Sequence, residues 1–351
     1  MSTTKNVYTV ESVTNGHPDK VCDQISDAIL DACLAQDPKS RVAVETFGSH
    51  GLLVLGGELT TSANIDAEAI ARKVYRDIGY TDHLNVIVHI AKQSPDIAQG
   101  VDQEGAGDQG IMYGYATDET PEYLPKGVAL VHSLTRGLEE LRTSGKLAWL
   151  MPDGKAQVTI ADGMVRSILV STQHGEDVSQ VEIKSALLEH LILPLVGSTE
   201  GIEILVNPTG RFVQGGFEAD AGLTGRKIMV DTYGGLVTHG GGAFSGKDAT
   251  KVDRSAAYMA RFAAKNIVAA GLAKSCLISL AYAIGHTEPL MVHAENEKGE
   301  DISHIAQKYF DFRPRAIIER LKLRRPIYAP TAAYGHFGKQ GLPWEEIIAL
   351  T

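Results

Sequence analysis

The order of apolar and polar residues along this chain predicts one series of secondary-structure elements three times over. The first series is a strand, a helix, two strands, a helix and a strand, at residues 8–10, 18–35, 41–47, 52–59, 66–78 and 85–91. The strands alternate apolar and polar residues, whereas the helices repeat apolar residues every three to four positions. Such a β-α-β-β-α-β series predicts an α+β fold, with helices packed on one face of a mostly antiparallel sheet.

The second and third series follow the same order. The second is predicted at residues 111–115, 128–141, 157–161, 165–171, 178–193 and 203–206, with a hairpin turn at Asp162-Gly163 and a helix end at Pro194. The third is predicted at residues 227–231, 253–270, 275–284, 289–294, 302–309 and 332–337, with Asp253 capping its long helix. The repeat lies in element order, not in residue identity. It predicts three structurally related domains, at residues 1–100, 105–216 and 217–351.

Length and composition agree with several globular domains. The chain has 351 residues, of which 44% are hydrophobic and 22% charged, and these values exclude a disordered or collagen-like chain. Its three cysteines, Cys22, Cys33 and Cys276, lack the spacing of a zinc site or a disulfide framework. We find no apolar signal segment at the N-terminus and no run of ~18 apolar residues, so we expect a cytoplasmic protein without a membrane partner.

The chain is acidic overall, but one stretch departs from this. With 33 Lys and Arg against 43 Asp and Glu, the formal net charge of −10 argues against a nucleic-acid partner. Eleven of the 36 glycines lie between residues 207 and 247. Between residues 205 and 254, six Lys and Arg stand against five Asp and Glu, so this glycine-rich stretch is slightly positive. It is therefore the first place to look for an anion-binding site.

The first candidate site is GHPDK at residues 16–20, at the predicted start of a helix. Pro18 suits the first helical turn, and the helix dipole favours Asp19 there. A histidine, a carboxylate and a lysine at a helix N-terminus also suit an anion and metal site. The plainer alternative is that Asp19 and Lys20 only cap and solubilise the helix.

The second candidate is HGGGAFSGKD at residues 239–248. From Gly241 it has the GxxxxGK spacing of a P-loop, but Asp248 occupies the position of the Ser or Thr that would bind Mg²⁺. It also stands outside a predicted strand–loop–helix unit. Consecutive glycines would still let backbone N–H groups converge on a phosphate beside the Lys247 ammonium. A flexible surface loop is the alternative.

The segment before that loop is also rich in glycine and positive charge. DAGLTGRK at residues 220–227 ends in Arg226 and Lys227, which together could grip a polyphosphate. In NPTGRF, at residues 207–212, Phe212 could stack on a base, although an aromatic residue at a strand end more often belongs to a core.

Two more stretches each predict a turn followed by a strand. They are GAGDQG at residues 105–110 and PDGKAQV at residues 152–158. In the second, Asp153 and Lys155 would point the same way if the segment is extended.

Together these stretches resemble the S-adenosylmethionine synthetase family, also called the methionine adenosyltransferases. GHPDK, GAGDQG and HGGGAFSGKD occur in the family's order, accompanied by ETF, GGELTTSA, KQSPDI, NPTGRF, GLTGRK, KVDRSAAY and TAAYGHFG. The resemblance covers nearly the whole chain. It implies synthesis of S-adenosyl-L-methionine from ATP and L-methionine, followed by hydrolysis of the triphosphate to phosphate and diphosphate.

The same resemblance implies an assembly and cofactors. We expect three related α+β domains, a homodimer or a dimer of dimers, and an active site between subunits. Mg²⁺, two ions per site, and K⁺ are the implied cofactors. In the family reaction the methionine sulfur attacks C5′ of ATP and expels the triphosphate. A thioether has no proton to lose, so catalysis needs positioning and cations on the leaving group rather than a general base.

The resemblance also assigns roles to residues at matching positions. The implied catalytic residues are His17, near the bridging oxygen, and Lys155, Arg226 and Lys247. The implied ATP contacts are His17, Asp153, Lys155, Arg211, Phe212, Asp220, Arg226, Lys227, Ala243 and Lys247. The implied methionine contacts are Glu58, Gln93, Asp108, Asp220 and Lys251. The implied metal ligands are Asp19 and Asp253 for Mg²⁺ and Glu45 for K⁺.

The chain departs from the family pattern in a few places. The stretch between Gln93 and Gly105, a gating loop in the family, is several residues shorter than usual, and Ala249 and Ala221 replace a common proline and a common cysteine. No charged catalytic group is lost. We therefore expect the same reaction, with weaker closure over the site and more tolerance of methionine analogues.

Two rival activities are left to test. The first rival is a catalytically silent family member that acts as a regulatory subunit. Such a protein would be expected to lose some of the basic residues implied for the active site. This chain keeps all five of them: His17, Lys155, Arg226, Lys247 and Lys251. A P-loop phosphotransferase would release ADP, whereas a synthetase releases phosphate and diphosphate.

Overall fold

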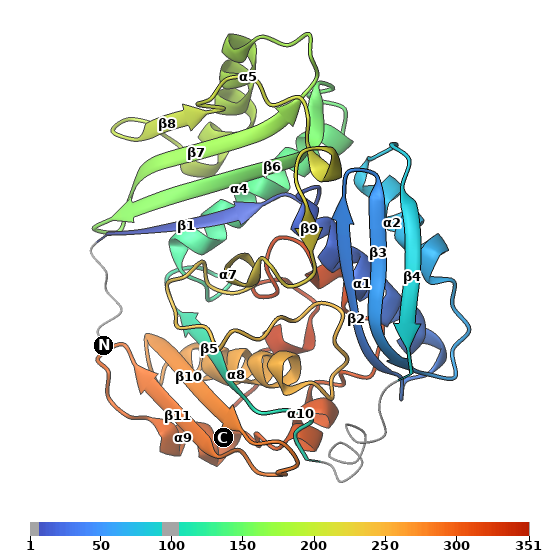
Figure 1. Ribbon diagram of the computed structural model, residues 1–351. Coiled ribbons are helices and arrows are strands. Elements are labelled where there is room, and N and C mark those ends of the chain that lie inside the picture. Colours follow the sequence, from blue (N-terminus) through green and yellow to red (C-terminus); the bar gives the residue numbers. More distant parts are fainter. Residues whose placement is uncertain (1–6, 93–104, 351) are drawn as a thin grey trace.

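The computed structural model describes residues 7–92 and 105–350, which form three β-sheets around a central group of helices (Figure 1). Three long helices, α1 (Pro18–Gln36), α4 (Lys126–Thr143) and α8 (Val252–Ala269), each pack on one of the sheets. The prediction of an α+β fold with helices on mostly antiparallel sheets is confirmed. Among the described residues, we find no helix that is both long enough and apolar enough to cross a membrane.

The strands are distributed over two four-stranded sheets and one three-stranded sheet. The first has the order β1-β6-β7-β8, with β1 (Val7–Val13), β6 (Leu150–Ala161), β7 (Met164–His174) and β8 (Glu203–Val206). The second has the order β4-β3-β2-β9, with β2 (Arg41–Ser49), β3 (Leu52–Thr60), β4 (Asn85–Ala91) and β9 (Gly222–Leu223). The third has the order β11-β10-β5, with β5 (Gly110–Thr117), β10 (Ser275–Tyr282) and β11 (Met291–Asn296).

The three sheets exchange strands between the thirds of the chain. Strand β1 of the first series pairs with β6 of the second, and β5 of the second pairs with β10 of the third. Strand β9, a two-residue strand of the last third that was not predicted, completes the exchange by pairing with β2 of the first series. The sheets are therefore built across the three segments of the chain, and β9 brings a glycine-rich segment of the last third beside α1.

Pairing within the sheets follows one scheme. The inner pairs β2–β3, β6–β7 and β10–β11 are antiparallel, whereas β3–β4 and β7–β8 are parallel. The predicted hairpin turn joins β6 to β7: Asp162 and Gly163 both have positive φ, 52° and 75°, as a type I′ turn requires.

The remaining helices are shorter. Helix α2 (Ala67–Ile78) begins after Asp66, whose side chain accepts from the Ala69 N–H, and it ends at Gly79. The others are α5 (Gln180–Leu187), α6 (Leu193–Val196), α7 (Ile228–Asp231), α9 (Ser303–Tyr309) and α10 (Pro314–Arg320). Three-residue 3₁₀ turns are η2 (Gly216–Glu218), η3 (Ala329–Thr331) and η4 (Pro343–Glu345).

Two predicted strands of the third series are wrong. Residues 227–231 form the single helical turn α7 rather than a strand. Residues 332–337 form turns, in which Tyr334 has a φ of 58° and Phe337 stacks on Tyr233. In both places apolar residues are buried by tertiary packing, without the backbone hydrogen bonds of a sheet. The alternation of apolar and polar residues therefore does not indicate a strand here.

Two predicted helix boundaries also need correction. The helix predicted to stop at Pro194 continues to Val196, because a π-helical turn, η1 (Leu188–Ile192), precedes it and places Pro194 in the first turn of α6, where a missing N–H is tolerated. Asp253 does not cap α8: the cap position is Lys251, which makes no side-chain cap bond, and Asp253 lies in the first turn.

Helix α8 forms the centre of the core. Sixteen of its eighteen residues are buried. Gly114 of β5 allows this close packing, since a Cβ at that position would lie 2.1 Å from the Ala260 carbonyl carbon. A helix surrounded on all sides gives a rigid support for the residues at its N-terminus.

Candidate active site

The N-terminus of α1 carries the first predicted site residues. Pro18 opens the helix, and His17 is its cap, because the Asp19 N–H donates to His17 Nδ1 over 3.1 Å. Asp19 lies in the first turn, where the helix dipole favours a carboxylate. His17 and Asp19 are only 3% and 2% exposed. The structure therefore places an imidazole and a carboxylate at a buried helix start.

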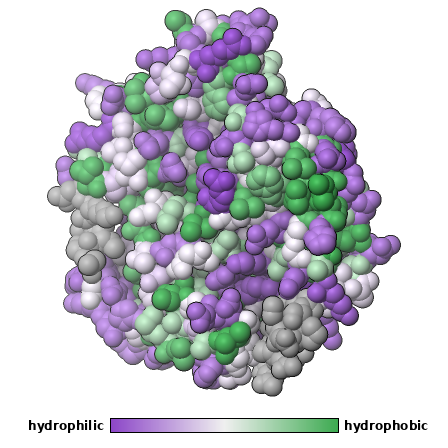
Figure 2. Space-filling view, in the orientation of Figure 1, coloured by the Kyte–Doolittle hydropathy of each residue, from purple (hydrophilic) through white to green (hydrophobic). Residues whose placement is uncertain are grey.

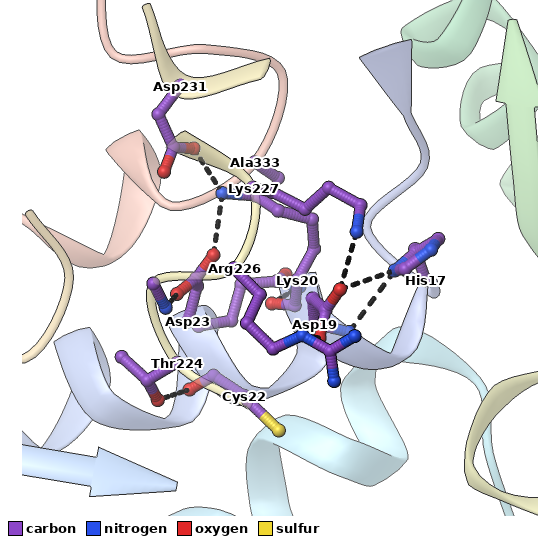
Figure 3. A network of polar contacts seen from close by, with 12 residues as sticks. His17, Asp19, Lys20, Cys22, Asp23, Thr224, Arg226, Lys227, Asp231 and Ala333 are labelled. Atoms are coloured by element: carbon purple, nitrogen blue, oxygen red, sulfur yellow. Dashed lines mark hydrogen bonds and ion pairs between the residues drawn. The ribbon is translucent and has the colours of Figure 1, made fainter. Parts of the chain in front are cut away.

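The segment that begins with β9 packs directly on this helix start. At Gly222 a Cβ would lie 2.2 Å from a carbonyl oxygen of the first helical turn. The Leu223 N–H donates to Asp19 Oδ1 over 2.9 Å, and the Lys227 ammonium lies 2.5 Å from Asp19 Oδ2. Arg226 Nε lies 3.7 Å from Oδ1 of the same carboxylate (Figure 3). Two cations thus gather at one buried carboxylate.

His17 is held in its neutral form by these surroundings. Burial lowers the pKa of His17 to about 3, and the Lys227 ammonium adds to the shift, while Asp19 opposes it and Lys155 adds a smaller part. Because Nδ1 accepts a backbone N–H, the proton of the neutral ring lies on Nε2. The ring can therefore donate one hydrogen bond through Nε2.

The second glycine-rich loop, residues 239–248, lies along the same edge of β2 as β9. The Val44 N–H donates to Gly246 O and the Asp248 N–H donates to Val42 O, both over 3.1 Å. Gly246 needs its φ of 80°, and a Cβ there would lie 2.0 Å from Val44 O. One strand edge thus holds both cationic loops.

The two loops meet each other and the start of α8. A Cβ at Gly225 would lie 2.6 Å from Ala243 Cβ, so the loops are in close contact. The Lys247 ammonium lies 2.8 Å from Asp253 Oδ2, and both side chains are about one quarter exposed. The predicted residues Ala243, Lys247 and Asp253 are therefore brought to one place.

Lys251 lies at the cap position of α8 but is paired. Its ammonium lies 2.5 Å from Asp248 Oδ2, which also accepts the Val42 N–H. Asp248 thus holds the loop against β2 and α8. The loop is not flanked by a strand and a helix in the P-loop manner, so the structure gives no support to the Walker alternative.

Strand β6 supplies two of the predicted ATP contacts. Asp153 is buried, and its Oδ2 accepts the Gly216 N–H over 2.9 Å, while its Oδ1 has no hydrogen-bond partner among the described residues. Burial raises the pKa of Asp153 to about 6. Lys155 is exposed on the same strand, at the position that pairs with Val13 of β1. Asp153 is thus a buried acceptor, and Lys155 is available to an anion near His17.

Arg211 and Phe212 follow the first sheet but do not join the cationic cluster. Arg211 is 70% exposed and lies 2.5 Å from Glu176 Oε1. The Phe212 N–H donates to His174 Nε2, and the ring is half-buried. Within the described part of the chain, no polar contact connects either residue to Asp19 or Lys247.

Glu45 and Glu58 project from the face of the second sheet opposite α1. Glu45 is exposed on β2 and Glu58 is half-buried on β3, with Ala43 as the partner of Glu58 in the ladder. Ala43 also forms a bridge with Lys247. Glu58 therefore lies one strand away from the cationic loop, on a face without a helix.

The last three predicted site residues are Asp108, Asp220 and Gln93. Asp108 and Asp220 are exposed, and each accepts the backbone N–H of the residue that follows it. Gln93, together with the loop whose length differs from the family pattern, lies outside the described residues.

Sequence analysis missed a row of carboxylates on α1. Asp19, Asp23, Asp27 and Asp31 are four residues apart and share one helix face. All four accept backbone N–H groups from the last third of the chain, donated by Leu223, Gly225, Gly246, Tyr328 and Ala329. The signal was present as an aspartate every fourth residue in a helix that is otherwise largely buried.

The carboxylates of the site are the candidate ligands for a metal ion. In the described ranges, no group of three or more His, Cys, Asp or Glu side chains is close enough to hold a metal ion by itself. Mg²⁺ commonly binds one or two carboxylates and completes its shell with phosphate oxygens and water. Asp19 and Asp253, each beside a lysine at the cationic cluster, fit such a shared site. Glu45 alone offers one exposed carboxylate.

Fold and site together define a class: an α+β protein whose glycine-rich loops gather cations for a polyphosphate. Three family descriptions match nearly the whole chain. They are the N-terminal, central and C-terminal domains of S-adenosylmethionine synthetase, at residues 5–95, 103–212 and 214–346. Proteins named S-adenosylmethionine synthase are similar throughout: one of Thermus thermophilus is 52% identical over 97% of this chain and 95% of its own length. One of Deinococcus deserti is 49% identical over 97% and 96%. The chain belongs to the S-adenosylmethionine synthetase family.

Proposed function

We propose that this protein is a methionine adenosyltransferase that makes S-adenosyl-L-methionine from ATP and L-methionine. The observation that carries the proposal is the cationic cluster of Arg226, Lys227 and Lys247, assembled from two loops beside His17. The family membership of the whole chain supports the same activity.

The cluster suits the chemistry of this reaction. The sulfur of methionine uses a lone pair to form a bond to C5′ of ATP, and the C5′–O bond breaks, so the electron pair leaves with the triphosphate. The product is a sulfonium cation, and no proton is transferred at sulfur. Negative charge grows on the departing oxygen, so fixed cations there stabilise the transition state more than the ground state.

His17 acts at the departing oxygen in this proposal. Its neutral ring can donate a hydrogen bond through Nε2, and a buried donor is worth more than one in water. Arg226, Lys227 and Lys247 then hold the phosphates, with Lys155 added from the first sheet. This arrangement provides a hydrogen-bond donor at the leaving atom and charge along the chain of phosphates.

The remaining substrate contacts are proposed by similarity. For ATP they are Asp153, Arg211, Phe212, Asp220 and Ala243; for methionine they are Glu58, Gln93, Asp108, Asp220 and Lys251. Lys251 is paired with Asp248 and is 21% exposed, so its ammonium can be reached by a substrate carboxylate while it stays close to Asp248. Glu58 on the bare sheet face suits the methionine ammonium.

Metal ions complete the proposed site. The family generally uses Mg²⁺ and K⁺, and we assign Asp19 and Asp253 to Mg²⁺, because each carboxylate pairs with a lysine of the cationic loops. Bound Mg²⁺ would add positive charge to the phosphates. Glu45 is proposed for K⁺. The same cations would hold the triphosphate for its hydrolysis to phosphate and diphosphate.

The proposed assembly is a homodimer, or a pair of dimers, with the active site between subunits. Phe47 and Ile87 are exposed on the outer face of the second sheet, and Val54 lies between them in the register. We call these three residues the outer apolar patch (Figure 2). It adjoins Glu45 and Glu58, so a second subunit on this face would cover both carboxylates.

We also propose the limits of the three domains and the location of the protein in the cell. The domain limits 1–100, 105–216 and 217–351 refer to chain segments and not to sheets, since the sheets exchange strands. A cytoplasmic location is proposed from the activity, because ATP and methionine are cytoplasmic metabolites.

Product analysis tests the proposal. The protein is incubated with ATP, L-methionine, Mg²⁺ and K⁺, and products are separated by chromatography. S-adenosylmethionine with equimolar phosphate and diphosphate is the expected result. ADP would indicate a phosphotransferase, and the absence of any product would indicate a silent member.

A further inference from the structure

The cation nearest the site that the reaction does not use is Lys20. It follows Asp19, and its side chain is fully buried. Its ammonium donates to Asp23 Oδ2 over 2.9 Å and also to Asp231 Oδ1 (Figure 3). Burial works against the charge, but the two carboxylates outweigh it, so the pKa of Lys20 lies above its usual range. Lys20 is therefore a charged bridge between two buried carboxylates.

These carboxylates hold both ends of the segment that carries Arg226 and Lys227. Asp23 Oδ1 accepts the Gly225 N–H over 2.8 Å, one residue before Arg226. Asp231 ends α7, the helical turn that begins directly after Lys227, and its N–H donates to Lys227 O over 2.9 Å. Lys20 thus connects the two ends of one short segment to α1.

Among the described residues, the other basic groups near the two carboxylates do not bind them as the ammonium of Lys20 does. The Lys339 ammonium also acts on Asp231, but it donates its hydrogen bonds to three backbone carbonyl oxygens. His336 Nε2 lies 3.6 Å from Asp231 Oδ1, but burial holds the pKa of His336 well below its usual value, so the ring is neutral. Without Lys20, the carboxylates of Asp23 and Asp231 would repel each other in a buried place. The segment would then move away from Asp19, or one carboxylate would take up a proton.

We propose that Lys20 is a positioning residue for the cations that bind the triphosphate. It does not touch substrate. It fixes the backbone on either side of Arg226 and Lys227, so that both side chains lie at Asp19 without a ligand to hold them there. Such preorganisation matters because cations that must first be arranged stabilise a transition state less. The inference rests on the proposed function, since the ligand of these cations is the triphosphate.

The test compares Lys20→Met with the unchanged protein. Binding of tripolyphosphate in the presence of Mg²⁺ is measured by calorimetry, and kcat and the KM for methionine are measured by S-adenosylmethionine formation. We expect tripolyphosphate affinity and kcat to fall by about ten- to a hundredfold, the range for residues that orient ligand-binding groups from behind. The KM for methionine should stay within about twofold, because all its proposed contacts except Asp220 lie on other segments, and Asp220 precedes the stretch between Gly225 and Asp231.

A second variant keeps the test decisive if Lys20→Met does not fold. In Lys20→Met/Asp231→Asn, one cation and one anion are removed together, so the buried net charge equals that of the unchanged protein. We expect this variant to regain thermal stability but not tripolyphosphate affinity. If affinity and kcat return with stability, Lys20 is only structural and the proposal is wrong.

Lys265→Met is the matched control, because Lys265 is another buried lysine, bound to Glu345 at the far end of α8. It should lose stability without losing tripolyphosphate affinity. An equal loss of affinity in this control would also overturn the proposal. The unchanged protein tests the proposed function separately: if it makes S-adenosylmethionine while Lys20→Met binds tripolyphosphate normally, only the role of Lys20 is refuted.

Discussion

At the scale of single residues, the cations of the site are paired with carboxylates before any substrate arrives. Lys227 pairs with Asp19 and Lys247 with Asp253. The Lys247–Asp253 pair is about one quarter exposed on both sides, so it adds little stability and a polyphosphate with Mg²⁺ can exchange partners with it. In the other pair Asp19 is buried, and only the lysine reaches solvent. This explains how cations of an acidic protein are held in place and yet remain available.

Lys247→Met is expected to lower kcat by about 10²–10³-fold, because it removes one cation from the leaving phosphates. The fold should persist, since the Lys247 side chain is 26% exposed and Asp253 can be solvated without it. Steady-state rates with ATP and methionine measure the first effect, and thermal unfolding measures the second. A less than fivefold change in kcat in a folded variant would contradict the assigned role.

His17→Asn is expected to slow adenosyl transfer more than hydrolysis of added tripolyphosphate. In the proposed mechanism the imidazole donates to the oxygen that departs from C5′, whereas hydrolysis of free tripolyphosphate does not involve that bond. Single-turnover formation of S-adenosylmethionine is compared with phosphate release from tripolyphosphate in the same variant. Equal slowing of both steps would indicate that His17 only caps α1.

At the scale of elements, α1 organises the site. Its four aspartates hold three separate segments of the last third of the chain by their backbone N–H groups. Arg254 of α8 adds a fully buried pair with Asp27, at 2.6 Å. The helix thus fixes the loops through main-chain contacts, and the side chains of Arg226, Lys227 and Lys247 are the ones that we propose to bind phosphate.

Gly222→Ala is expected to destabilise the protein by about 1–3 kcal/mol and to reduce activity strongly. The added methyl group would meet backbone atoms of the first turn of α1, which cannot turn away as a side chain can. Thermal unfolding and initial rates are the measurements. Gly175→Ala is the control, because the nearest atom to its new Cβ lies 3.9 Å away and little change is expected. Equal effects of the two substitutions would refute close packing at Gly222.

Asp31 should make the stability of the protein dependent on pH. Burial raises its pKa to about 6, above the ordinary value of 3.8, so the folded state binds the proton more tightly than the unfolded state does. The contribution to the free energy of unfolding is therefore greatest at low pH and is lost as the pH rises from about 4 to about 6. Relative to Asp31→Asn, the unchanged protein should lose about 2 kcal/mol across this window.

Denaturant unfolding at several pH values measures the difference between the two proteins. Using the difference cancels the titration of other groups. A constant difference from pH 4 to pH 7 would show that Asp31 has an ordinary pKa.

At the scale of the whole molecule, the three sheets exchange strands in a closed cycle. Because β1, β5 and β9 each belong to another segment's sheet, no third of the chain can complete its own sheet. The exchange also brings the start of α1, the strand β6 and the two glycine-rich loops to one region. The site is thus a consequence of the exchange and not of any one segment.

The outer apolar patch should control assembly and activity together. Ile87→Asp places a charge on a side chain that is 47% exposed, so the single chain should remain folded while the dimer weakens. Light scattering coupled to size-exclusion chromatography measures the mass, and rates are taken at the same concentration. Val181→Asp, at an 80% exposed position on α5, is the control. A fully active monomer would refute the placement of the site between subunits.

Prediction from sequence succeeded where a pattern is local. Helices 18–35 and 128–141 and the hairpin at Asp162-Gly163 agree with α1, α4 and the β6–β7 turn, because helical periodicity and turn residues act over a few positions. It failed at 227–231 and 332–337, where the chain is shaped by Asp231, Tyr334 and Phe337 packing against distant segments. Short apolar runs cannot distinguish a strand from a packed turn.

The sequence by itself determined the α+β class, the helix that begins at Pro18, the cationic glycine-rich loops and the resemblance to one family. These properties depend on residue types and spacing along the chain. Only the tertiary structure decided that β9 pairs with β2, that Asp23 and Asp231 share Lys20, and that Lys247 faces Asp253. Such contacts join residues up to about two hundred positions apart, and their geometry depends on burial and strand exchange, which no local pattern records.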